Sequence, residues 1–413
     1  MSFSQMKKTF FAFFTAAAFL AQAQQTVNLS MGASYANDIY YSFAGGEIKT
    51  EPALNWDLGF TIRPQDASIL INEAKGVRVF VVSDNISDWN SIDTSGMQQR
   101  ELHNSTESWS LGALANMGTS HPDYGWGEYN QFTHNVNAKR IFVLQLSDGS
   151  FKKLIIDTMT AMGQQVTFRL ADLDGNNEIA KTAIKTNYAG KNFFYYNIAD
   201  DQFLDREPMS AEWDMVFRRY SLPIQAGPVV LNYIVMGAQT NIGIRSARVL
   251  GAIPNAADSV NYTLDNTDMS RIGSDWKSFN NATFQWALTD SLSYFVTSQG
   301  GRIYQLIFTA FGGGSTGDIS FSQNRGTSIG IQESTLSEFK IFPNPTKDLL
   351  NIQSESSSFH IALLDNSGRT LLEKQIDNQT ETQLNLAFLP SGSYFVRIQS
   401  ENKLSTLRVI LSH

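Results

Sequence analysis

The chain of 413 residues contains no cysteine. Disulfide bonds, thiol catalysis, cysteine-ligated zinc and iron–sulfur clusters are therefore excluded. The sequence also lacks an apolar run long enough to span a bilayer, so we do not expect an integral membrane protein. Its 31 basic and 39 acidic residues give a net charge of −8 with no basic cluster, which argues against nucleic-acid binding.

Histidine is scarce, and its spacing matches no common hydrolase. The five histidines form no His-Glu-x-x-His zinc motif, and we assign no Gly-x-Ser-x-Gly nucleophile on a strand–helix turn. The glycine-rich segment from Gly312 to Gly317 is expected to be a flexible strand connector. We therefore expect no enzyme, no catalytic residue and no metal site, and a secreted hydrolase is the less favoured alternative.

The N-terminus has the pattern of an export signal. Lys7-Lys8 precede an apolar run from Thr9 to Leu20, and Ala21-Gln22-Ala23 supplies a small-x-small cleavage site. Residues 1–23 are therefore predicted to be a secretory signal peptide. An exported chain without cysteine must gain its stability from packing, and the 42% hydrophobic content suffices for sizeable cores.

One pattern occurs twice: a tyrosine pair, then Glu-Pro, then Trp-Asp followed by a phenylalanine. It predicts an internal duplication in an all-β protein, with related β-rich domains over residues 24–186 and 187–323. Alternation of apolar residues places the aromatic side chains of both Trp-Asp strands on one face, toward equivalent cores. We expect the two copies to superpose on these segments, which are Tyr40-Tyr41, Glu51-Pro52 and Trp56 to Phe60, then Tyr195-Tyr196, Glu207-Pro208 and Trp213 to Phe217.

Each predicted copy also contains a hairpin. Asp148-Gly149 separates two apolar runs in the first copy, and Gly300-Gly301 does so in the second. An Asp-Gly pair in this context is typical of a type I′ turn. Between the Trp-Asp strand and the hairpin, the two copies show no convincing similarity, as expected of loops on a duplicated scaffold.

The segment from His121 to Tyr129 is the candidate ligand site. Glycines alternate with aromatic residues there, so a shaped loop is predicted in place of a helix or strand. Tyr124, Trp126 and Tyr129 could stack on sugar rings, or they could fill a core beneath the loop. His121 and His134 could ligate a haem iron, with Met117 or Met97 as alternates. The second copy has no histidine between residues 195 and 323, so we expect at most one haem per chain.

Beyond a polar linker at residues 324–335, the chain contains about seven short strand patterns, which predict a small C-terminal β-sandwich. Residues 336–413 resemble the type A C-terminal sorting domain of the Bacteroidetes type IX secretion system. The resemblance rests on Pro343-Asn344-Pro345, the turn at Gly368 and the strand that begins with Gly392 and Tyr394. It implies transport by that secretion machinery across the outer membrane, followed by release or surface attachment.

Residues 37–323 resemble the HmuY-like family of all-β haem-binding proteins through the Tyr-Tyr, Glu-Pro and Trp-Asp motifs and the hairpins. The resemblance implies haem as a cofactor, but the family's ligand motif has no counterpart that we can match residue by residue. The sequence thus predicts a secreted or cell-surface binding protein. Haem is one candidate partner, and a glycan or a surface protein is the alternative.

Overall fold

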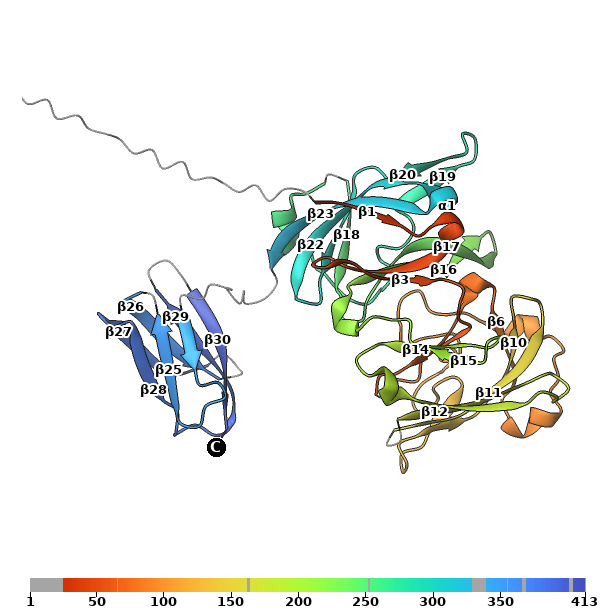
Figure 1. Cartoon of the computed structure of the whole chain (residues 1–413), viewed down its shortest axis with the longest axis horizontal. Helices are drawn as coiled ribbons and strands as arrows, with labels where there is room; N and C mark the ends of the chain where they lie inside the picture. Colours follow the sequence, from red (N-terminus) through yellow and green to blue (C-terminus); the bar gives the residue numbers. More distant parts are fainter. Residues whose placement is uncertain are drawn as a thin grey trace, which may run out of the picture. The chain divides into compact units, whose positions relative to one another are not determined.

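The computed structural model describes residues 25–64, 66–161, 164–251, 253–328, 339–354, 356–365, 369–400 and 404–412. The chain separates into two compact units, residues 1–327 and 328–413 (Figure 1). Regular structure is nearly all β-strand, which confirms the all-β prediction, and the one α-helix described, α1 (Gly313–Thr316), is a single turn. No described helix is long and apolar enough to cross a membrane. The short 3-10 turns are η1 (Ala33–Tyr35), η2 (Glu73–Lys75), η3 (Ile86–Asn90), η4 (Met97–Arg100), η5 (Lys185–Tyr188), η6 (Ser210–Glu212) and η7 (Ala256–Asn261).

The first sandwich of the large unit packs a sheet with the order β13-β12-β11-β10-β6-β7 against a sheet with the order β15-β14-β4-β5. The hairpin of β8 and β9 joins the larger sheet through β11. The strands are β4 (Leu58–Thr61), β5 (Ile69–Ile71), β6 (Arg78–Ser83), β7 (Glu101–Leu102), β8 (Gly127–Tyr129), β9 (Val136–Ala138), β10 (Ile141–Gln145), β11 (Phe151–Thr160), β12 (Gln165–Ala171), β13 (Ile179–Ile184), β14 (Phe193–Asn197) and β15 (Gln202–Leu204).

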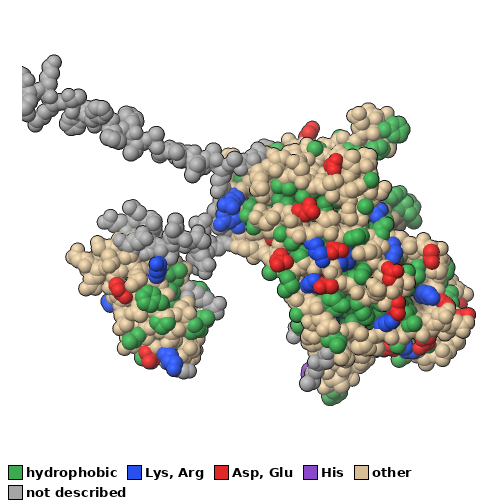
Figure 2. All heavy atoms as spheres, in the orientation of Figure 1, with side chains coloured by type: hydrophobic (Ala, Val, Ile, Leu, Met, Phe, Trp, Pro, Cys, Tyr) green, Lys and Arg blue, Asp and Glu red, His purple; other side chains and the backbone are tan. Residues whose placement is uncertain are grey.

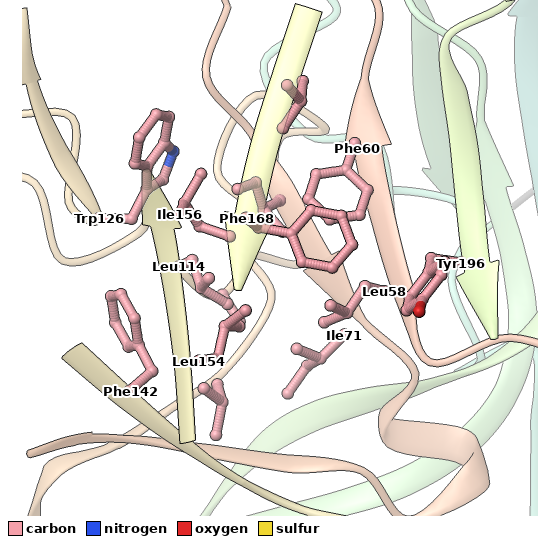
Figure 3. Close-up of a cluster of buried hydrophobic side chains, with 14 of the residues drawn as sticks. Leu58, Phe60, Ile71, Leu114, Trp126, Phe142, Leu154, Ile156, Phe168 and Tyr196 are labelled. Atoms are coloured by element: carbon pink, nitrogen blue, oxygen red, sulfur yellow. The ribbon is translucent and has the colours of Figure 1, made fainter. Parts of the chain in front are cut away.

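Alternation of side chains along each strand builds the core of this sandwich. In β12, Val166, Phe168 and Leu170 are buried, and the residues between them are not. The Phe60 ring stacks on Phe168 and on Phe194, with 5.2 Å between centroids in each pair. Figure 3 shows Phe60 and Phe168 side by side in this cluster of buried side chains.

The second sandwich packs a sheet with the order β1-β23-β22-β21-β18 against one with the order β17-β16-β2-β3. A separate hairpin of β19 and β20 projects from it (Figure 1). The strands are β1 (Gln25–Ser30), β2 (Asn37–Ser42), β3 (Gly46–Pro52), β16 (Met215–Ala226), β17 (Val229–Thr240), β18 (Ser246–Leu250), β19 (Lys277–Asn280), β20 (Gln285–Leu288), β21 (Leu292–Thr297), β22 (Arg302–Phe311) and β23 (Asp318–Ser328).

The tyrosine strand of each predicted copy pairs with the Trp-Asp strand of the other copy. In one pairing Tyr196 lies opposite Leu58, and in the other Tyr41 lies opposite Met215, which is the same offset. The predicted boundary at residue 186 therefore does not separate the two sandwiches, because β14 and β15 of the predicted second copy complete the first sandwich, and β1–β3 of the predicted first copy complete the second. Because the two Trp-Asp strands pair with a tyrosine strand at the same offset, either tyrosine strand could pair with either of them. The order of the segments along the sequence therefore could not reveal which strands are partners. Superposition of the copies stays a prediction.

Trp56 and Trp213 differ from the predicted alternation. Each lies before its strand, and both are fully buried in a cluster apart from the two sandwich cores, whereas Phe60 and Phe217 lie in those cores. The neighbouring Asp57 accepts a hydrogen bond from the Ile198 amide at 2.8 Å. Each tryptophan instead meets a tyrosine of the strand paired with its own segment, Trp56 with Tyr195 at 4.9 Å and Trp213 with Tyr40 at 5.1 Å between centroids.

Both hairpins turn through three residues, so the type I′ prediction is wrong. The Leu146 amide donates to the Ser150 carbonyl at 2.8 Å, and the Ser298 amide donates to the Arg302 carbonyl at 2.7 Å. Only the glycine that ends each loop has a positive φ, 84° at Gly149, whereas a type I′ turn needs two such residues. In the first hairpin the Asp148 carboxylate accepts the Ser150 amide at 2.9 Å, which favours the longer loop.

The C-terminal unit is a sandwich of sheets with the orders β24-β25-β28 and β27-β26-β29-β30. Tyr394 is nearly buried and its hydroxyl donates to the Pro390 carbonyl, while Asn344 accepts the Ile410 amide. The predicted signal peptide, Gly368 and most of the linker lie outside the described residues. The strands are β24 (Phe339–Phe342), β25 (Leu349–Ser354), β26 (Ser358–Leu364), β27 (Thr370–Asp377), β28 (Glu381–Asn385), β29 (Gly392–Gln399) and β30 (Leu404–Leu411).

Candidate functional site

The loop that begins at His121 is anchored by Trp126. This indole is fully buried in the first core, and its Nε1 donates to the Ala67 carbonyl at 2.8 Å. Gly125 lies before it with φ of 85°, and a Cβ there would come within 2.3 Å of the Leu114 carbonyl oxygen. Only glycine fits such a close approach. Trp126 is thus a core residue and is not available as a stacking surface.

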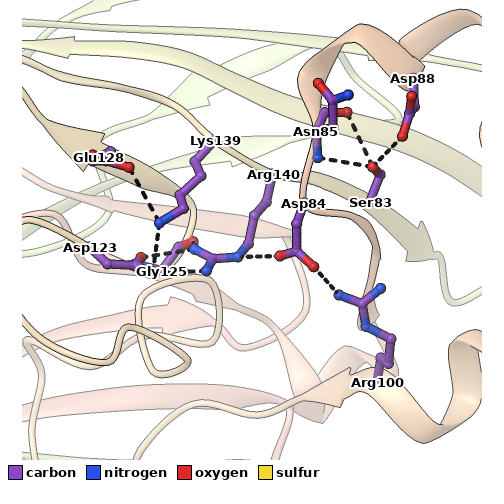
Figure 4. Close-up of polar contacts among 10 residues, drawn as sticks. All are labelled: Ser83, Asp84, Asn85, Asp88, Arg100, Asp123, Gly125, Glu128, Lys139 and Arg140. Carbon is purple, nitrogen blue, oxygen red and sulfur yellow. Dashed lines mark hydrogen bonds and ion pairs between the residues drawn. The ribbon is translucent and has the colours of Figure 1, made fainter.

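An ion-pair network around the buried Arg140 holds the same loop to the larger sheet. Asp123 accepts two hydrogen bonds of 2.8 Å from the Arg140 guanidinium, and Arg140 also binds the Gly125 carbonyl and Asp84 (Figure 4). Lys139 adds a further contact to Asp123 at 3.1 Å. The Arg140 guanidinium holds the pKa of Asp123 well below its usual range. The loop is therefore rigidly placed by charge-assisted hydrogen bonds.

A cavity of about 590 Å³ lies beside this loop. It is bounded by the loop, by the β8–β9 hairpin and by the end of β11, and Lys185, the first residue of η5, also lines it. Its volume falls within the range of about 300–1,000 Å³ typical of small-molecule sites. The lining residues are Pro64, Asp66, Ala67, His121, Tyr124, Tyr129, His134, Val136, Met159, Thr160, Ala161, Gln164 and Lys185.

Four of the five predicted ligand residues line this cavity as a group of rings. The Tyr129 ring lies 5.1 Å from His121, 6.3 Å from Tyr124 and 6.1 Å from His134 between centroids. Its hydroxyl hydrogen-bonds with His134 Nδ1 at 2.6 Å. The aromatic faces and the imidazole nitrogens thus meet at one place, as a ligand with both apolar and polar groups requires.

Lys185 was not singled out from the sequence, although it is the buried cation of the cavity. It is 5% exposed, and its Nζ donates to Met159 Sδ at 3.2 Å and to the Arg63 carbonyl at 3.5 Å. Burial lowers its pKa to about 8. A weakly satisfied ammonium of this kind favours a ligand with an oxygen acceptor. No local signal could have revealed Lys185, since it lies more than forty residues beyond the loop.

Met97 and Met117, the alternative haem ligands offered by the sequence, do not line the cavity. Met97 packs in a small cluster with Phe80 and Val143, and Met117 packs against the first core. Within the described part of the chain, no group of three or more His, Asp or Glu side chains could hold a metal ion. The cavity nevertheless offers two imidazoles that a haem iron could use.

The second sandwich carries a hairpin of the same construction, which the sequence comparison missed. The side chains of Asn130 and Asn280 each accept the amides two and three residues on, at 2.9 to 3.2 Å. Four residues beyond each asparagine, His134 and Phe284 have φ of 59° and 54°. The likeness could have been found from a shared spacing: in each case a Trp is followed three positions later by an aromatic residue and then directly by Asn.

The expectation that the chain lacks a Gly-x-Ser-x-Gly sequence is wrong, because residues Gly313 to Gly317 have this pattern. It lies between β22 and β23 and includes α1, so the strand–helix position is present. The Ser315 hydroxyl donates to the Gly312 carbonyl at 3.1 Å, and no histidine is paired with it in the described residues. The segment therefore lacks the base that would make Ser315 a nucleophile.

Comparisons with known proteins identify the C-terminal unit alone. No curated protein matches the sequence. One similar solved structure, titled "Biofilm associated protein - BSP domain", is 10% identical, covers 88% of this chain and 68% of its own, and has a TM-score of 0.16. A likeness this weak supports no argument about fold or function. The resemblance of residues 37–323 to the HmuY-like family stays a prediction.

Residues 340–412 match the family described as a secretion system C-terminal sorting domain. This confirms the sorting domain predicted for residues 336–413 and the seven strands that build it. The chain therefore carries the domain that marks proteins for export across the outer membrane by the type IX secretion system, to the cell surface or the medium.

Proposed function

We propose that the exported chain is a non-enzymatic glycan-binding protein and that the cavity of the first sandwich takes a sugar ring. The observation that carries this proposal is the meeting of Tyr124 and Tyr129 with a buried ammonium in one cavity. Sugar C–H faces pack on aromatic rings, and sugar oxygens accept hydrogen bonds. Trp126, which the sequence offered as a third platform, serves the core instead.

The polar lining supports a sugar over a wholly apolar ligand. Lys185 Nζ needs oxygen acceptors, and Gln164 supplies an amide that can donate and accept at the cavity wall. At neutral pH most Lys185 side chains are protonated, because the lowered pKa of about 8 still lies above 7. A sugar with a carboxylate would gain an ion pair there, so acidic glycans are expected to bind more tightly than neutral ones.

The scarcity of carboxylates in the cavity lining supports binding without hydrolysis. Glycosidases place two carboxyl groups across the scissile bond. Among the described lining residues the one carboxylate is Asp66, and it is held by Arg63, Ser110 and the Ser68 amide. A carboxylate engaged in this way is not free to act as an acid or a nucleophile.

The test is affinity electrophoresis of the full chain in gels that contain alginate, pectin, starch or hydroxyethyl cellulose. Retardation in at least one gel is expected, and Tyr129→Ala or Lys185→Met should weaken it by about tenfold, which corresponds to about 1.4 kcal/mol. Tyr233→Ala is the matched control, since this half-exposed tyrosine lies outside the cavity lining. Unchanged mobility of the wild type in every gel would refute glycan binding.

Haem is the second candidate, favoured by the two imidazoles in the cavity. His121 and His134 both contact the Tyr129 ring, and Met159 and Val136 supply apolar surface for a porphyrin. The HmuY-like resemblance points the same way. Titration with haemin should then give a Soret band that shifts in His121→Ala or His134→Ala. An absorbance spectrum that stays that of free haemin removes this candidate.

A further inference from the structure

A row of aromatic rings crosses the surface of the second sandwich. The neighbouring centroids are 6.5 Å apart for Phe284 and Phe279, 5.2 Å for Phe279 and Trp286, and 5.0 Å for Trp286 and Phe311. Tyr35 then stacks on Phe311 at 6.2 Å with the planes within 6°. The rings come from η1, β19, the turn after it, β20 and β22, so the row is made only by the tertiary fold.

The outer three rings of this row lie open to solvent. Phe284 is 78% exposed, Phe279 43% and Trp286 40%. Figure 1 shows the β19–β20 hairpin projecting from its sandwich, and Figure 2 shows hydrophobic side chains gathered at the end of that projection. Three large exposed rings on one hairpin are uncommon in a soluble protein and mark a contact surface.

The row is held in place from beneath. Gly313 leaves room for the Trp286 indole, since a Cβ there would come within 2.6 Å of its Nε1. The Lys277 ammonium lies under the rings, 4.8 Å from the Phe311 centroid and 5.8 Å from that of Trp286, and donates to the Met236 carbonyl at 2.6 Å. Rings fixed in this way lose little side-chain entropy when a ligand stacks on them.

The hairpin residues beside the outer three rings carry no charge. From Ser278 to Thr289 the hairpin carries no charged side chain, and the exposed positions between the rings are Asn280, Asn281, Ala282, Thr283 and Gln285. Neutral amides and hydroxyls beside aromatic faces match the alternating C–H faces and hydroxyl groups of a neutral sugar chain. The hairpin of the first sandwich, built in the same way, lines the cavity already described.

We propose that the row of Phe284, Phe279, Trp286, Phe311 and Tyr35 is a second glycan site, which binds several consecutive units of a neutral polysaccharide chain. The inference rests on the proposed function and extends it. One chain would then hold a polymer at two places, the cavity and the row. Two linked sites raise the apparent affinity for a polymer well above that of either site alone.

The experiment compares binding of a polymer with binding of its short fragment, using hydroxyethyl cellulose in affinity gels and cellotriose in calorimetry, with a galactomannan and mannotriose as a second pair. Phe284→Ala combined with Trp286→Ala should weaken polymer binding by about tenfold or more and leave trisaccharide binding at the cavity unchanged. Tyr129→Ala should weaken the trisaccharide instead. Phe132→Ala is the matched control, since this residue is 85% exposed on the first hairpin but outside the cavity lining.

The outcomes separate the two proposals. Polymer binding that is unchanged in the double variant overturns the second site and leaves the cavity proposal standing. Trisaccharide binding that is absent, together with unchanged mobility in the alginate and pectin gels, while polymer binding depends on Phe284 and Trp286, overturns the cavity proposal alone. If the double variant loses only its retention on whole cells, and not on either polysaccharide, the row contacts a protein and the second site is refuted.

Discussion

Trp56→Ala is expected to lower the free energy of unfolding of the large unit by about 4–5 kcal/mol. Truncation of a buried tryptophan costs about 3–5 kcal/mol through lost contacts and the cavity that remains. Trp56 has no exposed surface and meets the Tyr195 ring edge-on at 4.9 Å. The Arg206 and Arg218 guanidiniums also lie over its face, at 5.8 and 5.6 Å from the centroid.

The contact with Arg206 is the reason why the loss expected for Trp56→Ala lies in the upper part of the range for a buried tryptophan. Its side chain is buried and pairs with Asp38 at 2.9 Å, but its Nε and Nη1 have no hydrogen-bond partner among the described residues. The ring faces of Trp56 and Tyr195 therefore compensate a desolvated cation. Trp213→Ala should cost less, about 3–4 kcal/mol, because Trp213 meets Tyr40 but no such guanidinium in the described contacts.

The assay is urea unfolding of the full chain followed by tryptophan fluorescence. All seven tryptophans lie before residue 328, so the signal reports the large unit without interference from the sorting domain. Phe284→Ala is the control, expected to stay within about 0.5 kcal/mol of the wild type because the side chain is exposed. A loss below about 1 kcal/mol in Trp56→Ala would show that the ring is not packed as described.

Three further outcomes are expected. Burial lowers the pKa of Lys277 in the folded protein to about 7. Between pH 7 and about 10 the unfolded chain therefore binds more protons at this lysine than the folded chain does, and the free energy of unfolding should rise with pH by at most about 1.4 kcal/mol per pH unit. Lys277→Met should flatten that slope. Asp123→Asn should cost about 3 kcal/mol at pH 7. The cost should shrink as pH falls below about 4, because the depressed pKa of Asp123 stabilises the fold above its ordinary pKa and that gain is lost as pH falls toward the lowered one; a cost that does not change with pH would contradict the ion pair. Deletion of residues 336–413 should leave the large unit folded but confined to the periplasm, and normal appearance outside the cell by immunoblotting of fractions would contradict the sorting role.

Local pattern alone was enough for the fold class and the export route. Alternating apolar residues in segments such as Val166 to Leu170 specify strands because the side-chain period of a strand is two. The Pro343-Asn344-Pro345 and Gly392-Ser393-Tyr394 motifs located the sorting domain, and its family match covers residues 340–412. The concentration of rings between His121 and Tyr129 located a cavity wall, since glycines close to aromatic residues shape a loop wherever it lies.

The tertiary structure alone decided which strands are partners and what completes the site. The sequence order does not state that the tyrosine strand of one copy pairs with the Trp-Asp strand of the other, because both edges present the same register. Lys185 reaches the cavity because β12 pairs with both β11 and β13, so that Gln165 lies opposite Thr160 on one side and Ile184 on the other. The same holds for the row from Phe284 to Tyr35, whose members are up to 276 residues apart along the chain, as from Tyr35 to Phe311. Contacts of this kind depend on which edges and faces meet, and no local period carries that information.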